Sequence, residues 1–372
     1  MAKKEWGLRY SNFNNSLFNW DNLQKVPRLI KEHSPGQIVN TLRFAYHALR
    51  GFPVTHLPYD PKWLVLLITT HCNLHCYLCS FKNYTCPQPM RKSFQDMTLE
   101  LFGQILDTYP RAIVVELSGG EPLTHPGIFK MIHQAHARRM KVHIASNGTL
   151  VAKNLENILK APLEILNISF YGTDAASFAQ ATGADGALFD TIVEGITELA
   201  RRRPRGGYPR RLRTSFICTK DNLHRVPEFI RLSEKMGVDA VKLRNLRFHG
   251  IPGLPESKSL NAGDPEAEEF LDSLRRQRFQ VPVYLPRLPR RDDRRKCDQP
   301  FRLVAIDGDG FIGPCCCKAD QCCWGKLTKQ ANPWNGPAML RARRAHLDPN
   351  VPPPPVCWYC EERIPEQLRL GD

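Results

Sequence analysis

The sequence predicts an α/β fold with a parallel sheet, and three observations lead to this prediction. Short apolar strands alternate with helix-length amphipathic segments from Trp63 to about Leu246. Six such strand–helix units in succession require right-handed crossovers, which align the strands in parallel. The chain has 372 residues, 42% of them hydrophobic, which is enough for one large domain with a sizeable core and a smaller second domain. Six strands are too few to close an eight-stranded barrel.

The six predicted strands are short and mostly apolar. The first, Trp63–Thr69, is an almost continuous apolar run, as expected of a parallel strand buried on both faces. The helix after it places Leu99, Phe102 and Leu106 on one face and has Thr98 as a potential cap. The other strands are predicted at Arg111–Leu117, Lys141–Ala145, Glu164–Phe170, Leu212–Cys218 and Ala240–Arg244, and the other helices at Ile128–Arg139, Leu150–Lys160, Leu188–Arg203 and Val226–Met236.

Residues 1–62 are expected to form a largely helical extension before this core. Their clearest pattern is a stripe of apolar residues at helical spacing, made of Ile38, Leu42, Ala45 and Leu49. We expect the stripe to pack on the core of the protein. Contact of a basic amphipathic helix with a membrane interface is the alternative.

Two segments follow the core of residues 63–246. Residues 247–296 are rich in Gly, Pro and Arg and are interpreted as a linker or irregular region. Residues 297–372 are expected to form a small C-terminal domain. In this domain, the segment Leu303–Ile312 is typical of a β-hairpin with an Asp-Gly turn.

The chain is strongly basic, with a formal net charge of +15. Much of the positive charge lies in two runs, Arg201–Arg213 and Arg287–Lys296, which we interpret as solvated loops. An anionic substrate group near the second run, or an anionic membrane surface, is the alternative. Nucleic-acid binding is not expected, because no recognition motif is evident.

The cysteine content indicates metal binding in a reducing compartment. Thirteen cysteines occur in a chain whose N-terminal sequence has no apolar signal-peptide region. No apolar stretch approaches the roughly 20 residues of a transmembrane helix. We therefore expect a cytoplasmic metalloprotein with reduced thiols and no transmembrane segment.

Three of these cysteines, Cys72, Cys76 and Cys79, form a Cys-x3-Cys-x2-Cys motif directly after the first predicted strand. Three thiolates on one short loop can bind three irons of a cubane cluster and leave the fourth iron without a protein ligand. A structural zinc site would lack its fourth ligand. The loop follows the carboxyl end of a strand, which is the functional end of α/β barrels.

This motif in this context resembles the radical S-adenosylmethionine (radical SAM) enzymes. The resemblance implies an open, partial (βα)6 barrel, which agrees with the six predicted units. It also implies a [4Fe–4S] cluster whose free iron binds SAM, and one-electron reduction that cleaves SAM to a 5′-deoxyadenosyl radical. A reductant such as flavodoxin or ferredoxin would supply that electron.

The resemblance also assigns SAM contacts to residues that follow the strands. A Gly-Gly-Glu-Pro stretch after the second strand contacts the methionyl amine in the family, and polar residues after the third and fourth strands reach the ribose or carboxylate. Leu78 stands where many relatives have an aromatic residue before the third cysteine, and it is included as a cofactor contact. The expected contacts are Leu78, Gly119, Gly120, Glu121, Pro122, Ser146, Asn147 and Ser169.

The C-terminal cysteines form a second group. Cys297, Cys315, Cys357 and Cys360 could supply four thiolates to a [4Fe–4S] cluster or to a zinc ribbon. Behind a radical SAM core they resemble the SPASM/twitch extension, which implies one auxiliary [4Fe–4S] cluster. A surplus thiol could donate hydrogen to a substrate radical, and the weak candidates are Cys316, Cys317, Cys322 and Cys323.

The sequence thus favours a radical SAM enzyme of oxidoreductase or epimerase type. Its expected substrate is a sugar, a cyclitol or a related small molecule, because no peptide-capture domain is evident. The alternative is a peptide maturase that forms cross-links or D-residues. A non-catalytic iron–sulfur or zinc module is the third hypothesis.

Overall fold

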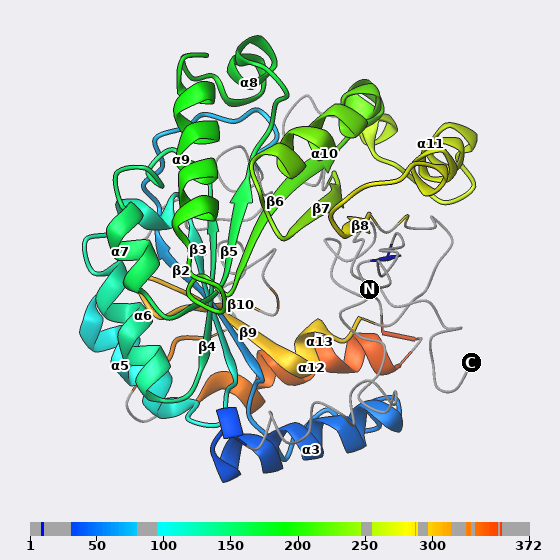
Figure 1. The fold of residues 1–372 in the computed structure, drawn as a ribbon. Coiled ribbons are helices and arrows are strands. Elements are labelled where there is room, and N and C mark those ends of the chain that lie inside the picture. The colour runs from blue at the N-terminus through cyan, green and yellow to red at the C-terminus, as the bar shows by residue number, and fades with distance from the viewer. Residues whose placement is uncertain are drawn as a thin grey trace. The chain divides into compact units, whose positions relative to one another are not determined.

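The computed structural model describes residues 9–10, 31–79, 95–246, 255–286, 288, 297–313, 315, 325–328, 332–348 and 350–351 (Figure 1). The chain divides into two compact units that are interleaved along the sequence. The first unit contains Met1–Asn12, Cys72–Thr85 and Ile144–Asp292, and the second contains Phe13–His71, Cys86–His143 and Asp293–Asp372. Within the described ranges, no helix is long and apolar enough to span a bilayer.

The first unit contains a parallel sheet. Four of its strands pair with one another in sequence order: β5 (Leu163–Ser169), β6 (Arg211–Cys218), β7 (Ala240–Asn245) and β8 (Val283–Leu285). The short strand β1 (Arg9–Tyr10) pairs with β8. Its helices are α7 (Leu155–Lys160), α8 (Ala175–Thr182), α9 (Leu188–Arg202), α10 (Val226–Lys235) and α11 (Pro265–Arg276).

A cluster of phenylalanines joins the sheet of the first unit to its helices. Phe170 follows β5, and its ring lies 5.3 Å from that of Phe189 on α9 and 5.8 Å from that of Phe178 on α8. Phe229 on α10 continues the cluster, with its ring 4.8 Å from that of Phe216 on β6. Aromatic burial of this kind fixes the helices on the sheet whose strand ends carry the candidate site.

The second unit contains a mixed sheet. Strand β2 (Trp63–Thr69) lies between β3 (Val114–Gly119) and β9 (Leu303–Asp307) and is parallel to both, while β10 (Ile312–Gly313) is antiparallel to β9. Its helices are α3 (Pro35–Leu49), α5 (Leu99–Thr108), α6 (Ile128–Ala137), α12 (Gln299–Arg302) and α13 (Pro337–Leu347). Strand β4 (Lys141–Ser146) begins in this unit and ends in the first.

The structure confirms the predicted α/β class with a mostly parallel sheet. Each predicted strand from Trp63 to Leu246 is present within about three residues of its expected bounds. The five predicted helices are present too, and Thr98 caps α5 as expected, because its Oγ1 accepts a hydrogen bond from the amide of Leu101 at 3.1 Å. The hairpin of residues 303–312 is also confirmed.

One flanking prediction needs correction. Residues 247–296 are not simply a linker, because α11 and β8 lie there. Asp264 caps α11 by accepting a hydrogen bond from the amide of Glu266, and Leu271 and Leu274 on the helix are buried. The Gly-, Pro- and Arg-rich segment therefore contains a capped amphipathic helix. The described part of the N-terminal extension contains α3 and the two-residue strand β1, which pairs with β8, and a largely helical extension stays a prediction.

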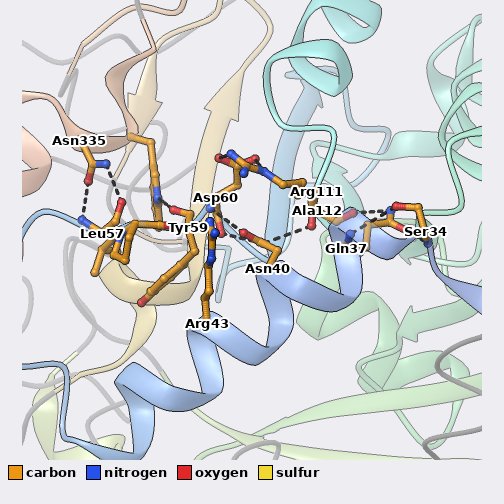
Figure 2. Close-up of polar contacts among 12 residues, drawn as sticks. Ser34, Gln37, Asn40, Arg43, Leu57, Tyr59, Asp60, Arg111, Ala112 and Asn335 are labelled. Atoms are coloured by element: carbon orange, nitrogen blue, oxygen red, sulfur yellow. Dashed lines mark hydrogen bonds and ion pairs between the residues drawn. The ribbon is translucent and has the colours of Figure 1, made fainter.

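The stripe predicted on α3 packs on the core only in part, and its Ile38 is half-buried. Ala45 is buried, but Leu42 is 60% exposed and Leu49 is 39% exposed. The helix instead buries polar side chains, including Gln37 and Asn40, whose amides bond to main-chain groups of the second unit (Figure 2). Periodicity identified the helix correctly but not the face that is buried.

Candidate active site

The three motif cysteines lie on a loop directly after β2. Cys72, Cys76 and Cys79 are half-buried. Main-chain hydrogen bonds attach this loop to the end of α8: the amide of His75 donates to Thr182 O at 2.9 Å, and that of Tyr77 donates to Ala181 O at 3.3 Å. The loop is therefore held by backbone contacts that do not involve the cysteine side chains.

A ring of hydrogen bonds lies beside the first cysteine. The Asn147 Nδ2 group donates to Asn73 Oδ1 at 2.8 Å, Asn73 Nδ2 donates to Thr149 Oγ1 at 2.8 Å, and Thr149 Oγ1 donates to Asn147 Oδ1 at 2.6 Å. The same Asn147 Nδ2 group lies 3.8 Å from Cys72 Sγ. The ring fixes the Asn147 amide with its N–H group directed at a cysteine sulfur.

Tyr171, just after β5, lies near the other two motif cysteines. Burial raises the pKa of its phenol, the nearby Cys76 and Cys79 thiols raise this pKa further, and the Arg244 guanidinium opposes the shift. Sequence reasoning assigned no role to Tyr171. The one signal that could have identified it is its place after the carboxyl end of a strand, where Ser169 and Asn147 were found.

These residues form a donor set that suits an iron–sulfur cluster. In the parts of the chain that the structure describes, no three His, Cys, Asp or Glu side chains converge as the ligands of a single metal ion would. Cluster thiolates each bind a different iron, so a cubane does not require such convergence. Three thiols on one anchored loop, with an amide N–H directed at Cys72 Sγ, match the chemistry of a cluster with hydrogen-bonded sulfur.

The Gly-Gly-Glu-Pro stretch packs against the residues that lead into the cysteine loop. The amide of Gly120 donates to Thr69 O, and that of Glu121 donates to His71 O, both at 2.7 Å. Gly119 has φ of 121°, and a Cβ at Gly120 would lie 2.0 Å from His71 O. Only glycine allows this close approach of two main chains.

The carboxylate of Glu121 already has a partner within its own turn. The side chain is fully buried, and Oε1 accepts a hydrogen bond from the amide of Leu123 at 3.0 Å, which caps a short 3-10 helix at Pro122–Thr124. This bond orients the carboxylate. A role of Glu121 in binding an ammonium group stays a prediction.

The other expected SAM contacts are placed as follows. Ser146 is buried, and its Oγ accepts from the amide of Gly148 at 3.1 Å, so it also stabilises the turn after β4. Ser169 lies 3.5 Å from Ser215, between their Oγ atoms, and hydrogen-bonds Tyr171. Leu78 is buried in the cysteine loop. Their contacts with a cofactor remain predictions.

The C-terminal cysteines are described only in part. Cys297 is buried just before α12, and Cys315 is half-buried after β10. The remaining members of the predicted ligand and donor sets lie outside the described residues: Cys316, Cys317, Cys322, Cys323, Cys357 and Cys360. The auxiliary-cluster ligands therefore stay a prediction.

The first arginine run is engaged in local ion pairs. Arg203 pairs with Asp239 at 2.5 Å, Arg202 pairs with Glu156 at 2.6 Å, and Arg201 pairs with Glu198 at 2.7 Å. The interpretation of the run as solvated loops holds only in part, because Arg203 is largely buried in its ion pair and Arg213, in β6, lies over the ring of Tyr284. The second run, Arg287–Lys296, lies outside the described residues except for Leu288.

Comparison with known proteins agrees with the site. Residues 66–233 match the family model described as the radical SAM superfamily. This segment is less than half of the chain, and it contains the cysteine loop and the Gly-Gly-Glu-Pro turn.

Two curated relatives match over part of their length. The chain is 30% identical over 202 residues to the tungsten-containing aldehyde ferredoxin oxidoreductase cofactor-modifying protein of Pyrococcus furiosus, covering 52% of this chain and 53% of the relative. It is 22% identical over 242 residues to the PqqA peptide cyclase of Granulibacter bethesdensis, covering 62% of each. The chain therefore spans about half to three fifths of the relatives that it matches.

Among solved structures, the fold is similar to that of SuiB from Streptococcus suis bound to the precursor peptide SuiA. The TM-score is 0.59 at 15% sequence identity, over 89% of this chain and 74% of SuiB. At this identity the likeness concerns the fold alone.

Proposed function

We propose that this protein is a radical SAM enzyme that modifies a peptide. The observation that carries the proposal is the anchored loop of Cys72, Cys76 and Cys79 beside the Asn147 amide, within a segment that matches the radical SAM family model. The peptide substrate is supported by two similar proteins, one named a peptide cyclase and one crystallised with a precursor peptide.

In this proposal Cys72, Cys76 and Cys79 hold a [4Fe–4S] cluster. When bound, the cluster and SAM supply a carbon-centred radical that removes hydrogen from an unactivated C–H bond. The chain itself anchors the loop, directs the Asn147 N–H group at Cys72 Sγ, and excludes side chains from the turn at Gly119 and Gly120. A protein of this kind mainly binds and orients its cofactors.

The remaining expected contacts would complete the binding of SAM. Glu121 would accept a hydrogen bond from the methionyl ammonium group, and Ser146, Asn147 and Ser169 would reach the ribose or the carboxylate. Leu78 and Pro122 are buried apolar groups next to these contacts in sequence and would shield them from water. A protein reductant of the flavodoxin or ferredoxin type would provide the electron.

The expectation of a sugar or cyclitol substrate is replaced by this proposal. It depended on the lack of an evident peptide-capture domain, and neither curated relative named above is described as acting on a sugar or cyclitol. Peptide maturation was the stated alternative, and the relatives favour it.

A second, auxiliary [4Fe–4S] cluster is part of the proposal. Cys297, Cys315, Cys357 and Cys360 would hold it completely, so it would transfer electrons and would not bind SAM. Its task would be to take the electron from the product radical, which turns hydrogen abstraction into a net oxidation.

The substrate class is tested by incubating the reconstituted full-length protein with SAM, a reductant and peptides encoded next to its gene. Mass spectrometry should show a peptide that has lost two hydrogens, as in cross-linking, or hydrolysis and chiral chromatography should reveal a D-residue. The triple variant of Cys72, Cys76 and Cys79 to Ala serves as the control. Turnover of sugars or cyclitols without modification of any such peptide would contradict the proposal.

A further inference from the structure

The buried face of helix α3 is mixed, because polar Gln37, Asn40 and Thr41 are buried on it together with apolar Phe44 and Ala45. The Gln37 side chain donates to Ala112 O at 2.8 Å, and Asn40 Nδ2 donates to Asp60 O at 3.1 Å. The amide of Asp60 returns a hydrogen bond to Asn40 Oδ1 at 2.8 Å. Figure 2 shows these side chains extending from α3 toward the main chain of the second unit. These bonds determine which face of α3 points outward.

The outward face of α3 is apolar. Val39, Leu42, Tyr46 and Leu49 follow one another at spacings of three, four and three residues, which places them on one side of the helix. They are 46%, 60%, 54% and 39% exposed. Together with Val54, just beyond the helix, they are five of the six exposed large apolar side chains in the part of the chain that the structure describes. Such a concentration on one helix indicates a contact surface.

Within the described segment of residues 34–59, the formal charges beside this face are positive. The segment from Ser34 to Tyr59 contains no Asp or Glu, whereas Arg43 and Arg50 are exposed beside the apolar stripe. Arg43 donates to the carbonyl of Pro58 at 3.2 Å, and Arg50 donates to the phenol oxygen of Tyr46 at 2.5 Å, so both contacts leave the charge uncompensated.

The nearest carboxylates in the sequence are neutralised by other cations. Asp60 accepts two hydrogen bonds from Arg111, at 2.8 and 3.0 Å, and Glu32 pairs with Lys141 at 2.8 Å. The positive potential over α3 is therefore not offset by the residues that flank it. An apolar stripe whose charged neighbours in the described segment 34–59 are cations complements a surface that is apolar inside and anionic outside.

We propose that the outward face of α3 lies on an anionic lipid surface. Val39, Leu42, Tyr46 and Leu49 would enter the boundary between headgroups and acyl chains, and Arg43 and Arg50 would bind the phosphates. Tyrosine is favoured at this depth, because its ring is apolar and its hydroxyl stays hydrated. A second copy of this chain is the poorer occupant, because two such faces would bring arginines together with no carboxylate to pair with them.

The test is co-sedimentation of the full-length, reconstituted protein with vesicles. We expect binding to vesicles of phosphatidylglycerol and phosphatidylcholine in equal parts, weaker binding at high salt, and little binding to phosphatidylcholine alone. The double variant Leu42→Ser and Tyr46→Ser should bind at least about tenfold more weakly, because it removes the two most exposed apolar groups. The double variant Arg43→Gln and Arg50→Gln should lose roughly fivefold for each arginine.

A charge-matched control separates this site from general attraction to a basic protein. Arg205→Gln and Arg211→Gln remove the same charge from exposed positions of the first unit and should leave vesicle binding within about twofold. Hydrogen exchange measured by mass spectrometry should show protection of residues 35–54 only when phosphatidylglycerol is present. This readout needs no variant, so it is independent of any folding defect.

Three outcomes would overturn the proposal. The first is no binding to the phosphatidylglycerol vesicles, and the second is equal weakening by the control pair and the Arg43 and Arg50 pair. The third is a concentration-dependent dimer that the Leu42 and Tyr46 variant dissociates, which would assign the face to a second copy.

Discussion

The Asn147 side chain links the cysteine loop to the turn after β4 through its hydrogen bonds. Its carbonyl oxygen accepts from Thr149, and its Nδ2 group contacts both Asn73 and Cys72 Sγ. The sequence identified Asn147 as a polar residue after a strand. It did not identify the ring, because Asn73 and Thr149 are 76 residues apart and meet only in the folded protein.

Replacing Asn147 with Ala should lower the reduction potential of the first cluster. An N–H group directed at a thiolate stabilises the more negative reduced state, so its loss shifts the potential downward. The expected change is on the order of tens of millivolts, equivalent to one hydrogen bond for a one-electron couple. A redox titration followed by electron paramagnetic resonance measures it. Asn154→Ala is the control, because its side chain donates to Leu150 O. An unchanged potential in the Asn147 variant would contradict the assigned contact.

Gly120 is the position at which we expect one added methyl group to reduce stability and activity most. A Cβ there would lie 2.0 Å from His71 O, which is main chain and cannot give way. We expect Gly120→Ala to reduce the free energy of unfolding by on the order of 3 kcal/mol and to abolish SAM cleavage. Urea unfolding and 5′-deoxyadenosine assays measure the two effects.

Gly103→Ala is the matched control for this change. Gly103 lies inside α5, and nothing lies within 4 Å of the position that its Cβ would occupy. Alanine is the better helix former, so stability should rise by about 0.5–1 kcal/mol. If both variants lost similar stability, the close contact at Gly120 would be refuted.

At the scale of elements, the strands were predictable and the orientation of α3 was not. Strand β2 is a continuous apolar run, and such a run can be satisfied only by burial on both faces. Helix α3 has apolar residues on both its exposed and its buried face, and its buried Gln37 and Asn40 bond to carbonyls contributed by Ala112 and Asp60. These partners are distant in sequence, so no local pattern shows which face they cover.

The orientation of α3 predicts an unusual order of mutational effects. Asn40→Ala should reduce the free energy of unfolding by about 2–4 kcal/mol, because it leaves main-chain groups of Asp60 and Arg111 without a buried partner. Leu42→Ala, on the exposed face, should change it by no more than about 0.5 kcal/mol. Denaturant unfolding of the two variants is the measurement. A larger loss for Leu42→Ala would mean that α3 packs through its apolar face.

At the scale of the whole molecule, the chemistry was easier to predict than the substrate. The cysteine loop and the glycine turn are short, contiguous segments, so spacing alone identifies them. Tyr171 was missed because its relation to Cys76 and Cys79 spans about ninety residues of chain. The parallel pairing of β9 with β2 was missed for the same reason. The sequence favoured a small molecule because no peptide-capture domain is evident, and an absence of this kind does not identify a substrate.

The most direct test of the account is SAM cleavage by the reconstituted full-length protein and its triple variant of Cys72, Cys76 and Cys79 to Ala. Two [4Fe–4S] clusters predict about eight irons per chain and formation of 5′-deoxyadenosine in the presence of a reductant. The triple variant should retain about four irons, held by the C-terminal cysteines, and form no 5′-deoxyadenosine. Cleavage that survives in the triple variant, or a single zinc ion in the unaltered protein, would contradict the assignment.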